Sequence, residues 1–284
     1  MKKLSAPITQ KIIFFLLFLI TLLIILPVIL IILIIIKNGI GVINWEFLTT
    51  FPRNGMREGG VFPAIIGTFC LVFGAVIFAV PIGVLTAIYL NEYAKKNLFT
   101  RLLKLAIINL AGVPSIVYGL FGLGLFVIFF KFGTSILAGS LTLAIMNLPV
   151  IITTTRESLS NVPQSFREVS LSLGASKWQT IQHVVLPNSI AGILTGIILE
   201  ISRAAGETAP ILFTVAAFYL PQLPKSAFDQ VMALPMHLFA ISTQIPNIAL
   251  NTRYATALVL LGVVFGVNLI AIIIRSNLRS KQKW

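Results

Sequence analysis

Three ionisable side chains stand within eight residues of an otherwise apolar stretch, ILEISRAAGETAPI. Arg203 follows Glu200 by three residues and precedes Glu207 by four, so a helix would place all three on one face, where they can partly neutralise one another. A charge at the centre of a membrane span costs about 2.5 to 3.5 kcal/mol on insertion scales. This face is therefore expected to point into a helix bundle or a wet pathway.

Two kinds of chemistry fit this charged face. The first is a buried network of ion pairs that fixes how two subunits pack. The second is contact between Arg203 and a passing anion, because a guanidinium stays charged and matches a tetrahedral oxyanion with forked hydrogen bonds. An arginine held between carboxylates would bind weakly enough to release the anion, as a conduit requires.

A second polar stretch, from Glu168 to Pro187, lies between two apolar runs. Its pattern predicts a short helix, a left-handed turn at Gly174, and a second helix that starts at Ser176 with Gln179 completing a capping box. Apolar residues line one face of this second helix until Pro187. A loop of this kind on the basic side of a membrane protein either binds another protein or lies on the membrane surface as an amphipathic segment.

The composition indicates an all-α integral membrane protein. Of 284 residues, 57% are hydrophobic and 10% charged, with a mean hydropathy of +1.00, whereas soluble domains are about 25% charged. The net charge of +13 comes from Lys and Arg that fall between apolar runs, which argues against a nucleic-acid partner. The single Cys70 excludes an internal disulfide, and His183 and His237 lie too far apart in sequence to favour a metal site.

The elements that must position these residues are six predicted transmembrane helices. They span about 12–36, 64–90, 105–130, 135–155, 190–217 and 254–274. We divide the chain into an N-terminal helix with an external loop (1–63), a transmembrane domain (64–274) and a tail (275–284). Residues 37–63, rich in Gly and Pro, are expected to be irregular. Glycines and prolines inside the spans indicate either a pathway lining or ordinary close packing of helices.

The distribution of Lys and Arg predicts the orientation. With a cytoplasmic N-terminus, fourteen of these residues fall inside and six outside, and Arg203 lies within a span. This places the Glu168–Pro187 loop and both termini in the cytoplasm. Residues 231–250 are also apolar, but Pro235 and Pro246 interrupt them, so we assign 221–253 to an external loop that dips toward the membrane interface.

The loop resembles the "EAA" loop of permease subunits of bacterial ABC importers. The shared features are Glu168, Gly174, nine intervening residues, and Val184 before the final Leu186-Pro187, whereas Val169 and Ser170 depart from the family's two alanines. In that family the loop docks into a cleft of a cytoplasmic ATPase. The resemblance therefore implies coupling roles that we assign to six positions: Glu168, Gly174, Ala175, Ser176, Leu186 and Pro187.

The charged face resembles permeases of phosphate ABC importers. The run from Arg203 to Pro210 is similar to their A-type subunit. The resemblance implies a type I ABC importer permease fold in the bacterial plasma membrane, with substrate passing Arg203 and Glu207, next to Glu200. Arg156 matches a further arginine of the family less closely. Implied partners are a second, homologous permease in a heterodimer, two ATP-binding subunits, and an external phosphate-binding protein.

The chain is not expected to be an enzyme. It lacks the G-x-x-x-x-G-K-[ST] phosphate loop, so ATP and Mg²⁺ are expected on the partner ATPase, and no cofactor, metal or catalytic residue is expected here. Three alternatives stay open: a permease for another oxyanion or an amino acid, an autonomous secondary transporter or channel, and a structural membrane anchor.

Overall fold

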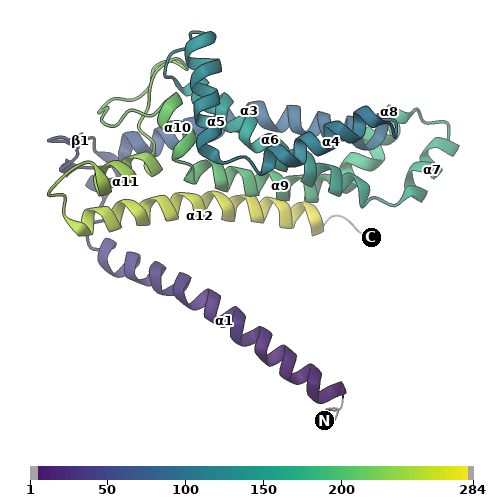
Figure 1. Cartoon of the computed structure of the whole chain (residues 1–284), viewed down its shortest axis with the longest axis horizontal. Helices are drawn as coiled ribbons and strands as arrows, with labels where there is room; N and C mark the ends of the chain where they lie inside the picture. Colours follow the sequence, from purple (N-terminus) through teal and green to yellow (C-terminus); the bar gives the residue numbers. More distant parts are fainter. Residues whose placement is uncertain (1–5, 281–284) are drawn as a thin grey trace.

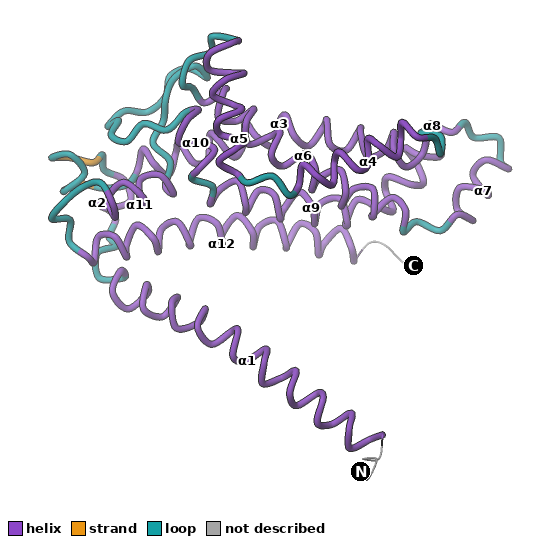
Figure 2. The backbone as a smooth tube through the Cα atoms, in the orientation of Figure 1, coloured by secondary structure: helices purple, strands orange, loops and turns teal. Residues whose placement is uncertain are grey.

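The computed structural model describes residues 6–280, which are mostly helical (Figure 2). Lys2, Lys3, Lys281 and Lys283, which contribute to the charge bias, lie outside the described residues. Five helices are long and apolar enough to cross a membrane. They are α1 (Ala6–Gly39), α3 (Phe62–Ile88), α6 (Ile136–Ser160), α9 (Leu186–Gly206) and α12 (Leu250–Ser280).

The remaining span is bent. Helix α4 (Leu98–Ala111) meets α5 (Ser115–Gly122) and the π-helical segment η2 (Leu123–Phe129) at 103°. Gly112 and Pro114 account for the break, because glycine weakens a helix and proline disfavours helical backbone in the residue before it. Counted as one span, this pair completes the six predicted transmembrane helices, although the bend itself was not predicted.

The bundle core consists of α3, α6, α9 and α12, packed side by side (Figure 1). Small residues mark the closest contacts: a Cβ on Gly83 would lie 2.6 Å from the Ile151 side chain, and Gly196 similarly meets Thr154. Here close packing of helices explains the glycines. Gly206, by contrast, has nothing within 4 Å of a built Cβ and directly precedes a helix break.

Helix α1 diverges from this bundle (Figure 1). It meets α12 near its C-terminal end, where a Cβ on Gly39 would lie 2.7 Å from the Tyr254 carbonyl oxygen. Its most apolar window is 0% buried. A helix that is apolar on all sides and exposed suits a membrane environment.

One end of the bundle carries short elements that precede α3. Helix α2 (Trp45–Thr49) is capped by Asn44, whose Oδ1 accepts from the Phe47 N–H at 2.7 Å. Strands β1 (Pro52–Arg53) and β2 (Glu58–Gly59) form a small antiparallel hairpin. The prediction that 37–63 is irregular was therefore wrong in part, because short caps and turns order this loop against a buried core that includes Phe47, Met56 and Val61.

Helix α11 (Leu234–Thr243) accounts for the apolar stretch at 231–250. Ten residues rise about 15 Å, half of a hydrocarbon core, so α11 is too short to span. Its apolar residues are buried within the protein instead, and they include Leu234, Met236 and Ile241. The count of six spans is therefore unaffected.

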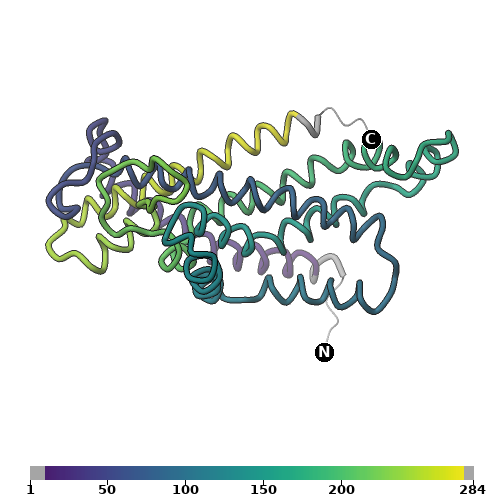
Figure 3. Tube along the Cα trace, turned by 90° about the horizontal axis from the view of Figure 1, so that it is seen from above, coloured from purple at the N-terminus to yellow at the C-terminus, as the bar shows by residue number. Residues whose placement is uncertain are grey.

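The opposite end carries α7 (Gln164–Ser172) and α8 (Lys177–Thr180), and α12 finishes toward it, as Figure 3 shows from a second direction. The sequence pattern predicted an apolar face on this second helix as far as Pro187. In the structure the helix extends beyond Pro187. It continues through the π-helical turn η3 (Ile181–Val185) into α9. Pro187 stands in the first turn of α9, where a missing N–H is tolerated.

Candidate functional site

The charged face lies where α9 breaks. The helix ends at Gly206, Glu207 has extended backbone (φ −71, ψ 136), and α10 (Ala209–Thr214) then starts with Pro210 in its first turn. Glycine and proline on either side favour this interruption. Irregular backbone at membrane depth occurs where it is buried in protein or lines a cavity.

Arg203 and Glu207 form an ion pair at this break. The Arg203 Nε donates to the Glu207 Oε1 at 3.3 Å, and the side chains are 38% and 16% exposed. The two Nη atoms of Arg203 make no hydrogen bond or ion pair to the described part of the chain. Four N–H donors of this guanidinium are thus free to bind an oxyanion.

Glu200 does not join this pair. It is only 4% exposed, and its Oε2 has no hydrogen-bond partner among the described residues. Of these three side chains, Arg203 and Glu207 form a direct ion pair, while Glu200 interacts with the Arg203 charge only at longer range. Glu200 is buried in the protein, whereas Arg203 and Glu207 keep part of their side chains exposed at the break.

Arg156 also lies apart from Arg203. Helices α6 and α9 run antiparallel, with Gly196 against Thr154 and Gly192 against Ser158. Arg156 is therefore level with residue 194, which is about 13 Å along the helix axis from Arg203. The structure brings Arg203 and Glu207 together and leaves Arg156 nearer the α7–α8 end.

A second break lies against the first. A Cβ on Gly119 of α5 would be 3.0 Å from the Ala209 carbonyl oxygen of α10, and Tyr118 donates to the Leu110 carbonyl at 2.7 Å across the bend. Two interrupted helices thus pack side by side near Arg203. The sequence analysis interpreted the glycines and prolines of the spans as pathway lining or close packing and did not predict that the two breaks meet.

The Glu168–Pro187 loop has the predicted local structure. Gly174 is left-handed (φ +84), Ser176 caps α8, and Gln179 completes the capping box. Glu168, Gly174 and Ser176 are exposed, as is Pro187, whereas Ala175 and Leu186 are half-buried. Of these six predicted coupling residues, Gly174, Ala175 and Ser176 form the turn between α7 and α8, Glu168 lies within α7, and Leu186 and Pro187 stand at the start of α9.

A profile of binding-protein-dependent transport system inner membrane components matches residues 79–283. The chain belongs to this family. It is thus a multi-pass membrane protein and a permease subunit of an ABC importer.

Relatives of this permease include two with contrasting names. One is the probable ABC transporter permease protein YqgI of Bacillus subtilis, 34% identical over 221 residues, covering 74% of this chain and 75% of that protein. Another is the phosphate transport system permease protein PstA 1 of Mycobacterium tuberculosis H37Rv, 38% identical over 218 residues, covering 76% and 70%.

Solved structures show the type I importer permease fold. A bacterial ABC transporter that imports the acidic polysaccharide alginate has a TM-score of 0.67 at 14% identity, covering 94% of this permease and 98% of that chain. The MetNI methionine transporter has a TM-score of 0.57 at 16% identity, covering 77% and 94%. At these identities the likeness concerns the fold alone.

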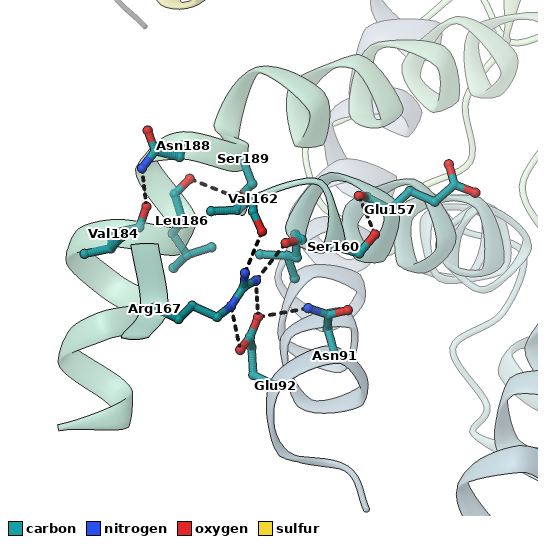
Figure 4. Close-up of polar contacts among 11 residues, drawn as sticks. Asn91, Glu92, Glu157, Ser160, Val162, Arg167, Val184, Leu186, Asn188 and Ser189 are labelled. Carbon is teal, nitrogen blue, oxygen red and sulfur yellow. Dashed lines mark hydrogen bonds and ion pairs between the residues drawn. The ribbon is translucent and has the colours of Figure 1, made fainter. Parts of the chain in front are cut away.

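The permease also contains a buried ion pair that sequence reasoning missed (Figure 4). Arg167 Nη2 lies 2.8 Å from Glu92 Oε1, and Arg167 Nε donates to Glu92 Oε2 at 3.4 Å. The side chains are 11% and 8% exposed. Because 75 residues separate the partners, no local spacing could have indicated the pair.

Proposed function

We propose that this permease forms the membrane pathway of an ATP-driven importer of inorganic phosphate. The observation that carries the proposal is Arg203, half-exposed at a helix break and with unoccupied Nη donors, in a chain whose relatives include permeases named for phosphate transport. Phosphate carries oxygens in the geometry that a guanidinium fork binds. The ion pair with Glu207 limits the affinity of Arg203 for the anion, so that phosphate is released.

The partners follow from the same proposal. A second, homologous permease would complete the pathway as a heterodimer, two ATP-binding subunits would carry ATP and Mg²⁺, and an external binding protein would deliver phosphate. The chain itself would have no catalytic site. Loop α7–α8 and both termini would face the cytoplasm, in agreement with fourteen Lys and Arg on that side.

The proposed cycle is alternating access. When the ATPase pair closes on ATP, it moves α7 and α8. The bundle then opens outward and accepts phosphate from the binding protein. Hydrolysis then resets the bundle so that it opens to the cytoplasm. In this cycle Arg203 and Glu207 meet phosphate in transit. Glu200 and Arg156 have weaker support as pathway residues, because one is buried and the other lies about 13 Å away along the bundle.

Uptake of labelled phosphate by the complete importer in proteoliposomes tests the proposal. We expect Arg203→Ala to reduce uptake by about 10- to 100-fold, since charged hydrogen bonds contribute about 1.5 to 3 kcal/mol. Arg203→Lys should retain part of the activity, because lysine keeps the charge and loses the fork. The exposed Arg101 provides the control, as Arg101→Ala should transport normally.

Two results would contradict the proposal in different ways. Unchanged uptake in Arg203→Ala would remove Arg203 from the pathway. Uptake of labelled sulfate or methionine but not phosphate by the unmodified importer would show that phosphate is not its substrate. Flux through this chain without any ATPase would instead indicate an autonomous transporter.

A further inference from the structure

Helix α7 has little apolar packing: Phe166 is partly buried against the cluster that includes Leu159 and Ile181. None of its residues is buried, and Val169 and Leu171 are 60% and 47% exposed. A cleft of about 620 Å³ separates parts of the α7–α8 loop from the bundle, lined by residues such as Asn91, Gln164 and Leu171. One partly buried aromatic side chain leaves most of α7 without apolar contacts, so polar contacts contribute much of its positioning.

Those contacts converge on one guanidinium (Figure 4). Besides its paired bonds to Glu92, Arg167 donates from Nη1 to the Val162 carbonyl at 2.7 Å and from Nη2 to the Leu159 carbonyl at 2.8 Å. Asn91 donates to the Glu92 Oε1 at 2.8 Å and holds the acceptor. Arg167 thus joins three segments: α7, the C-terminal end of α6, and the π-helical turn η1 (Tyr89–Tyr93) that ends α3.

The other arm of the loop reaches the same turn. The Lys177 Nζ of α8 lies 4.8 Å from the centroid of the Tyr93 ring, a cation–π contact. Ser170 and Thr180 join α7 to α8 through a hydroxyl hydrogen bond of 2.9 Å. Adjacent residues of η1, Glu92 and Tyr93, therefore hold one arm each, while Gly174 at the tip stays exposed.

We propose that η1 is the element that receives the motion of the α7–α8 loop and passes it to α3, with Glu92 and Arg167 as positioning residues. This inference rests on the proposed function. Helix α3 packs along α6 and also contacts α9, which carries Arg203. A displacement of the loop then moves α3, and through the contacts of α3 it also moves α9 and the pathway residue Arg203. Of the two ties, Glu92–Arg167 is the stronger because it is buried, charged and forked.

The test compares Arg167→Ala and Glu92→Ala with two exposed controls on the same side, Arg101→Ala and Glu157→Ala. The complete importer is assembled in proteoliposomes, and phosphate imported per ATP hydrolysed is measured beside the amount of co-purified ATPase. We expect transport per ATP to fall about tenfold or more in Arg167→Ala and Glu92→Ala, the two variants that break the Glu92–Arg167 clamp, while the controls match wild type. The double variant should be no worse than Arg167→Ala, because Glu92 has already lost its ion-pair partner in that variant.

A purely structural role predicts a different pattern. Fewer complexes would then assemble, but those that form would keep the wild-type ratio of transport to hydrolysis, and this result would overturn the inference. Arg167→Lys provides an intermediate variant, because lysine retains the charge but cannot make all four hydrogen bonds. Its ratio of phosphate transported to ATP hydrolysed should lie between those of wild type and Arg167→Ala.

Hydrogen exchange provides a readout that does not depend on the substrate. In the purified permease, amides of residues 164–172 should exchange about tenfold faster in Arg167→Ala than in wild type or Arg101→Ala. Unchanged protection would overturn the inference even if the clamp variants failed to assemble. Absence of phosphate uptake by the wild-type importer would instead count against the proposed function, and the exchange result would still decide whether the clamp positions α7.

Discussion

At the scale of single residues, charge and backbone conformation separate the two candidate regions. Arg203 lies at a helix break with free donors, whereas Arg167 uses four of its five N–H donors in hydrogen bonds within the protein. The same side chain type therefore serves two purposes: one guanidinium is available to a ligand, and the other holds protein segments together. Exposure and hydrogen-bond satisfaction distinguish them, although both occur beside a glutamate.

Gly174 offers a matched pair of substitutions. Its left-handed backbone (φ +84) is tolerated by Asn and Asp as well as Gly, and an added Cβ would meet nothing within 4 Å. We expect Gly174→Asp to reduce binding of the ATPase about tenfold or more, because docking would desolvate an unpaired charge. Gly174→Asn should bind nearly normally. Co-purification of the ATPase measures both, and equal losses would assign the effect to backbone strain instead of charge.

His237 predicts a pH dependence of stability. Burial lowers the pKa of this imidazole from 6.5 to about 4, and its Nδ1 has no hydrogen-bond partner among the described residues. As the pH falls, the unfolded chain binds a proton at His237 at a higher pH than the folded state does. The contribution of His237 to the free energy of unfolding is therefore fully present above pH 6.5 and is lost as the pH falls toward 4.

The loss should approach about 3 kcal/mol near pH 4. Thermal unfolding of the detergent-solubilised permease between pH 7.5 and 4 would measure it. His237→Leu should flatten the part of this dependence that lies between pH 6.5 and 4. An identical pH profile in the variant would mean that other groups cause the loss.

At the scale of elements, three π-helical turns in the described part of the chain interrupt the regular α-helices near the loop and the bent span. The π-helical turns η1 and η3 flank the α7–α8 loop at the ends of α3 and α9, and η2 ends the bent span. Such wide turns often mark functional positions because they re-aim side chains. Here η1 presents Glu92 and Tyr93 to the two arms of the loop.

The contact between α6 and α9 predicts which glycines resist enlargement. A side chain on Gly196 would overlap Thr154, whereas Gly262 of α12 has nothing within 4 Å of a built Cβ. We expect Gly196→Leu to destabilise the permease by about 1 to 3 kcal/mol through overpacking. Gly262→Leu should change stability little. Thermal unfolding in detergent and the yield of folded protein compare the two variants, and similar losses would contradict the assigned contact.

At the scale of the whole molecule, the bundle has two different ends. The hairpin β1–β2 and α11 lie at one end, and α7 and α8 lie at the other (Figure 1). The excess of Lys and Arg on the second side assigns that end to the cytoplasm in our proposal. The long, exposed α1 lies outside the bundle core. The other five of the six spans, counting the bent α4–α5 pair as one, pack together.

Thiol labelling tests this orientation. Cys70 is the only cysteine, so Cys70→Ala provides a clean background. Arg57→Cys places a thiol on the exposed hairpin, and Leu173→Cys places one beside Gly174, where the native side chain is 83% exposed. An impermeant reagent should label Arg57→Cys in intact cells and Leu173→Cys only after permeabilisation. The reverse pattern would invert the proposed topology.

Much of the architecture followed from local properties of the sequence. Hydropathy over about 20 residues predicts each span, because lipid must face apolar side chains along the whole crossing. The capping box at Ser176 and the left-handed Gly174 were predictable because their hydrogen bonds and dihedral angles involve residues only a few positions apart. The six spans and the two-helix loop were therefore determined by the sequence alone.

Only the tertiary structure decided which distant groups meet. Helical periodicity placed Glu200 beside Arg203, but packing against neighbouring helices buried Glu200 and left Arg203 exposed with Glu207. The Glu92–Arg167 pair joins positions 75 residues apart. Its formation depends on α3 and α6 lying parallel, and that alignment arises from burial of small and apolar surfaces between helices, which no spacing within one segment encodes.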